Sequence, residues 1–409
     1  MSRFMNDNGL SCFKNPHSTL MRGRAQDLSL VLIMAWSLGS VAQDAINVRV
    51  AGGVVLVPVQ IEGRNLNFLL DTGSTASAID PAEADSMGLT PQGKEEVLKN
   101  FRSLQADVAE VANFKLGKSN LNRVKLAEIN LAPISASVGT PVDGVLGADI
   151  LEKFTFKVNY SRAVLLVGPL DTLEPPGKTI PLRRTSGQFL IKATLISVPG
   201  EYVLDTGTNS TNVSWKIWQE LGRTWTPTNI VEGIARAGNP TSSAILVCLP
   251  EVTVGGVTLR DLAIRAQKRS DEGAFSSEDL NGILGFDVLR QFEVTFDLQH
   301  DRVFLKSDPG YKPDPYRYTT VGIQIGKNGQ GIYQIMSVWK DSPAAKGGIQ
   351  PGDLLEAVNG EATADIPTPE GVSAKLHAKA GTSVKLTIQR DGNLSTVALQ
   401  TRELLCGWQ

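Results

Sequence analysis

Two aspartates, Asp71 and Asp205, stand in the same short pattern of residues. Each ends an apolar run and is followed by Thr, Gly and a hydroxyl residue, as in Phe68-Leu69-Leu70-Asp71-Thr72-Gly73-Ser74 and Tyr202-Val203-Leu204-Asp205-Thr206-Gly207-Thr208. Such a run predicts a buried strand, and the glycine gives the backbone freedom to turn sharply at its end. Both carboxylates are therefore expected where water is scarce. Because a lone buried carboxylate is costly, each is expected to have a partner or a chemical task.

The pattern is part of a longer internal repeat. A second motif follows each aspartate and consists of two apolar residues between glycines, Gly144-Val145-Leu146-Gly147 and Gly282-Ile283-Leu284-Gly285. It begins 73 residues after Asp71 and 77 residues after Asp205. In both copies a short helical turn and a strand with period-two alternation come next. The repeat predicts two lobes of one plan, at residues 48–169 and 178–306, joined by a proline-containing linker.

Together these motifs resemble the lobe signature of the retropepsin and pepsin aspartic proteases, over residues 48–306. The resemblance implies a mainly β protein in which two retropepsin-like closed β-barrel lobes form a pepsin-like bilobal unit. It also implies that Asp71 and Asp205 are the catalytic pair, one from each lobe. The supporting residues would then be Thr72, Gly73, Ser74, Thr206, Gly207 and Thr208. In that family the threonines lock the two loops together, and the hydroxyl residues after the glycines hydrogen-bond the carboxylates.

Two facing carboxylates define the chemistry that the resemblance implies. Like charges about 3 Å apart cannot both ionise, so the pair holds one proton over a range of pH. The ionised aspartate takes a proton from a water molecule between the two, and the protonated one hydrogen-bonds the carbonyl of the scissile peptide bond. The expected reaction needs a polypeptide substrate but no metal ion, cofactor or nucleophilic side chain.

The expected flaps depart from the pattern of the family. A flap closes over the substrate, and the equivalent stretches here are at about residues 95–112 and 230–241. The second stretch has the glycines that a hairpin tip needs, at Gly233 and Gly238. Neither stretch offers the tyrosine that pepsin flaps carry. The substrate specificity is therefore left open by the sequence.

A different domain is expected after the second lobe. Residues 307–317 contain three prolines and predict a stiff linker. The stretch at 341–360, with its Ser-Pro-Ala, Gly-Ile, Gly-Asp and Val-Asn-Gly segments, resembles the PDZ domains of exported bacterial proteases and predicts a PDZ domain at residues 318–403. The resemblance places a turn that binds peptide C-termini at Val321, Gly322 and Ile323. The alternative is a PDZ fold that serves only as a packing module.

Composition narrows the remaining classes of function. The net charge is −2, so nothing favours nucleic acid or an anionic membrane surface as a partner. The chain has three cysteines and three histidines, which gives little support to a zinc site, a disulfide framework or a Ser-His-Asp or Cys-His enzyme. Cys248 and Cys406 lie on different predicted domains. They could pair, and the sequence leaves this open.

The N-terminal segment predicts export. Residues 28–38 form an apolar run of signal-peptide length, too short for a comfortable membrane span of about 20 residues. Ser40-Val41-Ala42 supplies the small residues that a signal peptidase requires. Residues 1–42 are therefore expected to be the signal peptide of a periplasmic or secreted protein. The alternative is an uncleaved membrane anchor at residues 28–41.

Two functions of different class fit these observations. The first is an exported aspartic endopeptidase whose PDZ domain binds the C-termini of substrates or partners. The second is a non-catalytic peptide-binding scaffold built on protease-like lobes and a PDZ module. Both Asp-Thr-Gly loops are intact, and a scaffold has no need for buried paired acids. The residues therefore favour the enzyme.

Expressed with its N-terminus, the protein should be exported, and its mature chain should begin at Gln43. The reason is the small-residue site that follows the apolar run. N-terminal sequencing of the purified protein checks this. A soluble intracellular protein that retains residues 1–42 would contradict it.

Overall fold

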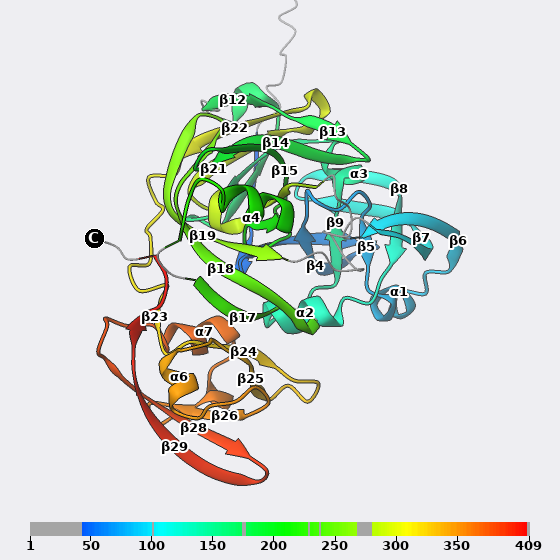
Figure 1. Cartoon of the computed structure of the whole chain (residues 1–409). Coiled ribbons are helices and arrows are strands. Elements are labelled where there is room, and N and C mark those ends of the chain that lie inside the picture. The colour runs from blue at the N-terminus through cyan, green and yellow to red at the C-terminus, as the bar shows by residue number, and fades with distance from the viewer. Residues whose placement is uncertain are drawn as a thin grey trace, which may run out of the picture. The chain divides into compact units, whose positions relative to one another are not determined.

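The computed structural model describes residues 43–99, 102–173, 177–227, 230–236, 239–267 and 280–406 (Figure 1), and within 95–104 and 232–243 it describes the backbone alone. The expected signal peptide, residues 1–42, lies outside these residues, as do the tips of both expected flaps. Among the described residues, no helix is both long enough and apolar enough to cross a membrane.

The first lobe is built around a closed barrel of six strands. In order around the barrel these are β3 (Val54–Ile61), β4 (Arg64–Leu70), β9 (Gly144–Leu146), β5 (Ala78–Ile79), β8 (Ser119–Glu128) and β7 (Arg102–Leu116). The barrel closes because β7 pairs with β3 as well as with β8. β2 (Arg49–Ala51) and β6 (Pro91–Lys99) extend the sheet at its two ends. The long β6–β7 hairpin is where the first flap was expected.

The second lobe repeats this barrel strand for strand. Its members are β14 (Gln188–Leu195), β15 (Val198–Leu204), β20 (Gly282–Leu284), β16 (Asn212–Ser214), β19 (Val257–Gln267) and β18 (Asn239–Val254). β18 pairs with β14 and closes the barrel, while β13 (Arg183–Thr185) and β17 (Ile230–Arg236) extend it. The β17–β18 hairpin is where the second flap was expected. The sequence repeat thus corresponds to two equivalent barrels.

Short helices accompany both barrels, and α1 corresponds in position to α4 and α3 to α5. The first lobe has α1 (Pro81–Ser86), α2 (Ala132–Val138), α3 (Ala148–Leu151) and the 3-10 turn η1 (Leu170–Thr172). The second has α4 (Trp215–Leu221), α5 (Phe286–Leu289) and the 3-10 turn η2 (Leu298–His300). α1 begins at a proline and is capped by Asp80, whose carboxylate accepts the N–H of Ala82 at 3.0 Å. α3 and α5 each follow the second glycine of the repeated Gly-x-x-Gly motif.

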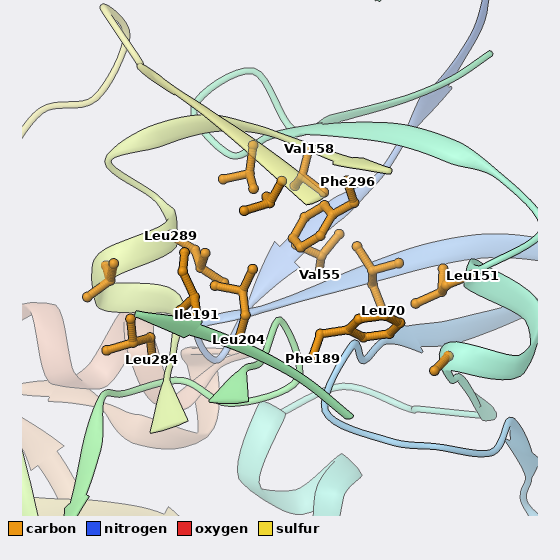
Figure 2. Packing of buried hydrophobic residues seen from close by; sticks show 14 of the residues in the cluster. Val55, Leu70, Leu151, Val158, Phe189, Ile191, Leu204, Leu284, Leu289 and Phe296 are labelled. Atoms are coloured by element: carbon orange, nitrogen blue, oxygen red, sulfur yellow. The ribbon is translucent and has the colours of Figure 1, made fainter. Parts of the chain in front are cut away.

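A six-stranded sheet joins the two lobes. Its order is β1 (Asp44–Asn47), β11 (Val164–Val167), β10 (Thr155–Asn159), β21 (Phe292–Asp297), β22 (Arg302–Ser307) and β12 (Lys178–Pro181). The two central strands are antiparallel, and the rings of Phe156 and Phe296 stack at 4.8 Å between centroids. Figure 2 shows Leu70 and Leu204, the last residues of β4 and β15, in the same buried cluster as Val158 and Phe296. One apolar core therefore runs through both lobes.

The C-terminal part folds around its own core. Its sheet contains β24 (Ile323–Lys327), β25 (Tyr333–Val338), β26 (Leu354–Val358), β28 (Ser383–Arg390) and β29 (Asn393–Gln400), with β27 (Glu361–Ala362) paired to β26. Its helical elements are α6 (Pro343–Lys346), η3 (Thr363–Asp365) and α7 (Pro369–Ala374). β23 (Thr319–Thr320) and β30 (Arg402–Glu403) pair where this part begins and ends. The separate buried cluster is what a domain with its own fold requires.

A disulfide joins Cys248 to Cys406, a pairing that the sequence left open. Their Cα atoms are 5.2 Å apart, although 158 residues separate them along the chain. Cys248 lies on β18 of the second lobe, and Cys406 follows β30. Cys406 is buried in a small apolar cluster that includes Trp339 and Leu405. The disulfide therefore ties the end of the C-terminal domain to the second barrel.

Candidate active site

The two aspartates follow directly on the inner strands of their barrels. β4 ends at Leu70 and β15 ends at Leu204, and each runs parallel to the short strand formed by the Gly-x-x-Gly motif. The N–H of Asp71 donates to the carbonyl of Leu146 at 3.0 Å, and that of Asp205 to the carbonyl of Leu284 at 3.1 Å. The apolar residues of that motif thus hold the backbone from which each carboxylate projects.

Thr72 and Thr206 join the two loops by reciprocal hydrogen bonds. The hydroxyl of Thr72 donates to the carbonyl of Leu204 at 2.7 Å. In the same way, the hydroxyl of Thr206 donates to the carbonyl of Leu70 at 2.7 Å. Each hydroxyl also accepts the backbone N–H of the other threonine at 3.1 Å. Both threonines are 1% exposed. The four bonds are closed off from water, where leaving a polar group unpaired is most costly.

Gly73 and Gly207 let the two carboxylates face each other. A Cβ atom at position 73 would lie 2.5 Å from Cγ of Asp205, and one at position 207 would lie 2.4 Å from Cγ of Asp71. Real Cβ atoms do not approach other atoms so closely. Glycine is therefore required at both positions for space, because each loop passes against the carboxylate of the other.

Backbone amides hold the two carboxylates unequally. Oδ1 of Asp71 accepts the N–H groups of Gly73 at 3.0 Å and Ser74 at 2.9 Å. Oδ1 of Asp205 accepts the N–H of Gly207 at 2.7 Å. Amide donors favour the ionised form of an acid. Asp71 accepts two amides directly, and the N–H of Gly73 also favours the anion of Asp205.

Burial and mutual charge raise the pKa of both acids. For Asp71 the cause is burial, which its backbone donors and its hydrogen bond with Asp205 partly offset. For Asp205 the pKa lies well above its ordinary range, first because of burial and then because of the neighbouring charge of Asp71. The pair therefore retains one proton at a pH where isolated aspartates have lost theirs, and the proton belongs to the pair as a unit.

The hydroxyl groups of Ser74 and Thr208 differ from the expectation that they hydrogen-bond the carboxylates. Ser74 reaches Asp71 through its backbone N–H, while its hydroxyl donates to the carbonyl of Ala76 at 2.8 Å. Within the described residues, the hydroxyl of Thr208 makes no hydrogen bond to Asp205, and its carbonyl accepts the N–H of Phe286 at 3.0 Å. The hydroxyl of Ser74 is directed instead at a turn carbonyl, which it satisfies.

Two further hydroxyl–carboxylate pairs brace the loops, and the sequence interpretation missed them. Ser77 donates to Asp149 at 2.6 Å and accepts the N–H of Gly147 at 2.9 Å. In the second lobe Thr211 donates to Asp287 at 2.6 Å and accepts the N–H of Gly285 at 3.3 Å. A signal was present in the sequence, because each hydroxyl lies six residues after its loop aspartate and each acid stands two residues after the last motif glycine.

The expected peptide-binding turn lies in the C-terminal domain, within its separate core. Val321 is fully buried, and Gly322 adopts a φ of +84°, which favours glycine. The carbonyl of Val321 accepts the N–H of Ala344, and that of Gly322 accepts the N–H of Trp339, both at 2.9 Å. Ile323 begins β24, which lies at the edge of its sheet. In the described part of the chain, no cluster of three or more His, Cys, Asp or Glu side chains could hold a metal ion.

Comparison with known proteins agrees with this arrangement in two segments. Residues 57–150 match the aspartyl protease family model, and residues 334–390 match a PDZ domain model. The first match covers β9 and the loop of Asp71 in the first barrel. The resemblance to aspartyl proteases and to PDZ domains is thus confirmed, and so is the fold: the protein is mainly β, with two closed six-stranded barrels followed by a PDZ domain.

Curated relatives also match the chain over short stretches. A probable CtpA-like serine protease of Staphylococcus saprophyticus is 39% identical over 83 residues, which is 20% of this chain and 16% of that protein. The carboxy-terminal processing protease CtpB of Bacillus subtilis is 33% identical over 82 residues, 20% of this chain and 17% of that protein. The magnetosome formation protease MamE of Paramagnetospirillum magneticum is 39% identical over 81 residues, 19% and 11% respectively. The chain therefore spans less than a fifth of the length of these relatives.

Among solved structures, the aspartic proteinase of Irpex lacteus is similar to this chain with a TM-score of 0.43 and 15% identity. The similarity covers 66% of this chain and 98% of that one.

Replacing Gly207 with alanine should abolish peptidase activity, with a loss of at least about 100-fold, because the new Cβ would displace the Asp71 carboxylate. A matched control is Gly222→Ala at the end of α4, where the nearest atoms to a new Cβ are 3.5 Å away. Turnover of a peptide substrate by both variants, with circular dichroism to verify folding, measures the effect. Near-normal turnover by a folded Gly207→Ala variant would contradict this geometry.

Proposed function

We propose that this protein is an aspartic endopeptidase in which Asp71 and Asp205 activate one water molecule, and in which the PDZ domain binds the C-termini of substrates or partners. The observation that supports the proposal is the set of reciprocal hydrogen bonds that joins the two aspartate loops. Four buried hydrogen bonds between Thr72 and Thr206 and their opposite strands hold two carboxylates against each other. A pair of acids held in this way is suited to hydrolysis without a covalent intermediate.

The unequal environments of the two acids suggest a role for each. Asp71, whose anion accepts two amide donors, takes a proton from the water as that water's oxygen bonds to the scissile carbonyl carbon. Asp205, whose pKa is raised by burial and by the charge of Asp71, donates its proton to the carbonyl oxygen. The tetrahedral intermediate then collapses: the C–N bond breaks, the leaving nitrogen takes the proton that Asp71 received, and the hydroxyl returns its proton to the pair. One water is consumed and the acids regain their single proton.

The names of the relatives include serine proteases, but the chemistry of this chain favours aspartates. Those matches span at most 83 residues, fewer than either lobe. Within the described residues, neither His300 nor His377 hydrogen-bonds a serine or cysteine. His300 instead contacts the carboxylate of Asp297 at 2.7 Å, and burial lowers the pKa of His377. A Ser-His or Cys-His pair is therefore not formed among the described residues.

The PDZ domain offers a sheet edge for peptide binding. An extended peptide adds a strand to an exposed edge, while backbone N–H groups hold its terminal carboxylate. β24 is such an edge strand, and α7 contacts it. Helix α2 of the first lobe also contacts β24, and Gly139 at its end lies against Pro369 of α7. A peptide bound at β24 would therefore compete with α2. This competition would link recognition in the PDZ domain to the catalytic lobes.

Export remains part of the proposal. The Cys248–Cys406 disulfide supports it, because disulfides persist in secreted proteins and in the periplasm but are rare in the reducing cytosol. We propose that the protein acts in the periplasm or outside the cell.

Asp71→Asn and Asp205→Asn should each remove nearly all activity, because asparagine keeps the shape of the side chain but cannot share the proton. The double variant should lose little more than either single one, since members of a catalytic unit are not additive. Turnover of an unfolded protein substrate from pH 3 to 8, with and without pepstatin, measures this.

The same variants provide a control for folding. Ionisation of Asp205 opposes folding because its pKa in the folded protein is raised, so this cost appears as the pH rises through that pKa. Asp205→Asn should therefore be at least as stable as the wild type at pH 7 in thermal unfolding. Near-normal turnover by either single variant would overturn the pairing of Asp71 with Asp205, and wild-type inactivity toward all substrates would favour the scaffold.

Gly322→Ala should weaken the binding of peptides that end in an apolar residue by at least tenfold, because its positive φ is strained for alanine and the new Cβ would lie 2.3 Å from Cβ of Ser342. Gly329→Ala, where a Cβ meets open space, is the matched control. Fluorescence anisotropy with full-length protein measures binding, and turnover of a short peptide should remain unchanged in both variants. Equal binding of a peptide with an amidated C-terminus would contradict carboxylate recognition.

A further inference from the structure

A buried glutamine reaches from the second lobe to the loop of Asp71. Gln188 is the first residue of β14, and its side-chain amide donates a hydrogen bond to the backbone carbonyl of Gly73 at 3.1 Å. The residue is 4% exposed, and a buried side-chain amide needs a partner of this kind. Figure 2 shows Phe189, the next residue, in the same buried cluster as Leu70 of the first lobe. The start of β14 is therefore held against the first aspartate loop.

A tight turn sets the position of Gln188. Ser186 and Gly187 join β13 to β14 with φ of +46° and +75°, and a type I′ hairpin turn requires positive values at both places. Thr185 pairs with Gln188 across this turn. A Cβ atom at position 187 would lie 2.9 Å from Cγ2 of Thr75. The turn therefore packs directly on the first aspartate loop.

The first lobe has the same turn but a different side chain after it. Gly52 and Gly53 join β2 to β3 with φ of +59° and +77°. A Cβ atom at position 53 would lie 2.7 Å from Cβ of Asn209, on the second aspartate loop. The residue that follows is Val54, which has no polar group to offer that loop. Among the described residues, no side chain donates to the carbonyl of Gly207. The two lobes therefore differ here by a glutamine in place of a valine.

The hydrogen bond from Gln188 acts on an amide that faces the aspartate pair. The carbonyl of Gly73 and the N–H of Ser74 belong to one peptide group, and that N–H donates to Oδ1 of Asp71 at 2.9 Å. The corresponding amide of the second loop is that of Thr208, which donates to neither carboxylate in the described part of the chain. A hydrogen bond at the oxygen of a peptide group polarises its N–H, and successive bonds strengthen one another. Gln188 therefore holds the Ser74 amide in place and makes it a stronger donor.

The titratable groups next to Asp71 are acids and a phenol. Asp205 faces it across the two loops. Tyr160 follows β10, and burial raises its pKa so far that it stays neutral. Asp149 of α3 lies behind the loop, where burial raises its pKa and Ser77 donates to it at 2.6 Å. Because burial raises the pKa of Asp71 while backbone amides lower it, the strength of each amide affects the pH at which the pair loses its first proton.

A cation of β13 also lies beside this hairpin, but it is already paired. The guanidinium of Arg184 lies 4.6 Å from the centre of the ring that follows Gln188 in the chain. It contacts Glu152 at 2.6 Å and Asp301 at 3.1 Å. The hairpin therefore acts on Asp71 through the neutral amide of Gln188 rather than through this charge.

We propose that Gln188 is a positioning residue that makes Asp71, rather than Asp205, the base of the pair. The inference rests on the proposed peptidase function and deepens it. Gln188 holds the peptide group after Gly73 with its N–H directed at Asp71, whereas Val54 gives the opposite loop no such support. Two acids in matching loops thereby acquire different roles.

Gln188→Leu keeps the approximate size of the side chain and removes the donor. The Asp71 anion should then be less stable, so the pair should lose its first proton at a higher pH. The acid limb of kcat/KM against pH should move up by about half a pH unit. The basic limb should stay in place, because Asp71 is ionised on both sides of it. Turnover of a short peptide from pH 3 to 8 measures this, with circular dichroism to verify folding.

Gln334→Leu is the matched control. It removes a hydrogen bond of the same kind in the PDZ domain, from a glutamine amide to the carbonyl of Gly352 at 3.0 Å, and its pH profile should match that of the wild type. An equal fall in kcat at every pH in Gln188→Leu would show that the bond is merely structural and would overturn the inference. A rise in KM with both limbs in place would make Gln188 a substrate contact and would overturn it as well.

A spectroscopic titration separates this inference from the proposed function, because it does not depend on turnover. Carbon-13 NMR of protein labelled at its aspartate carboxyl groups, with Asp71→Asn to identify the signals of the pair, reports the first proton loss directly. The upward shift should appear in Gln188→Leu and not in Gln334→Leu. Absence of the shift would overturn the inference even if the wild type cleaves peptides. The expected shift in a protein that cleaves no substrate would refute the proposed function but bear out the placement of the anion on Asp71.

Discussion

The structure depends on four hydrogen bonds that two threonines make across the boundary between the lobes. Thr72 and Thr206 are both 1% exposed, and each bridges to a strand carbonyl of the opposite barrel. Separation of the lobes would break all four hydrogen bonds together. The same bonds hold two acidic side chains against each other, which neither lobe would do alone. The site is therefore a property of the junction.

The central sheet and the segments next to the two loops support that junction. The central strands β10 and β21 pair directly, and the stacked rings of Phe156 and Phe296 continue the apolar core from one barrel into the other. Behind each loop, a hydroxyl–carboxylate pair connects the loop to the helix after the Gly-x-x-Gly motif. The disulfide restrains the far end of the PDZ domain.

Much of the fold could be predicted because its signals are local and occur twice. Apolar runs that end in Asp-Thr-Gly, and the Gly-x-x-Gly motifs after them, identify inner strands whichever lobe they occupy. The contacts of Ser74 and Thr208 could not be predicted in this way, since a hydroxyl beside a carboxylate can equally donate to a nearby carbonyl, as Ser74 does. Ser77 and Thr211 stand at the same offset from their loop aspartates, but their pairing was missed because each acceptor carboxylate lies more than 70 residues further along the chain.

The sequence by itself determined the two barrels, the PDZ domain and the residue types at the candidate dyad, because strand periodicity and glycine requirements act over a few residues. Only the tertiary structure decided that the glycine of each loop lies against the opposite carboxylate, that Asp71 has more amide donors than Asp205, and that Cys248 meets Cys406. Such contacts depend on how separate elements pack, and packing is set by the sum of many distant interactions rather than by any one stretch of chain.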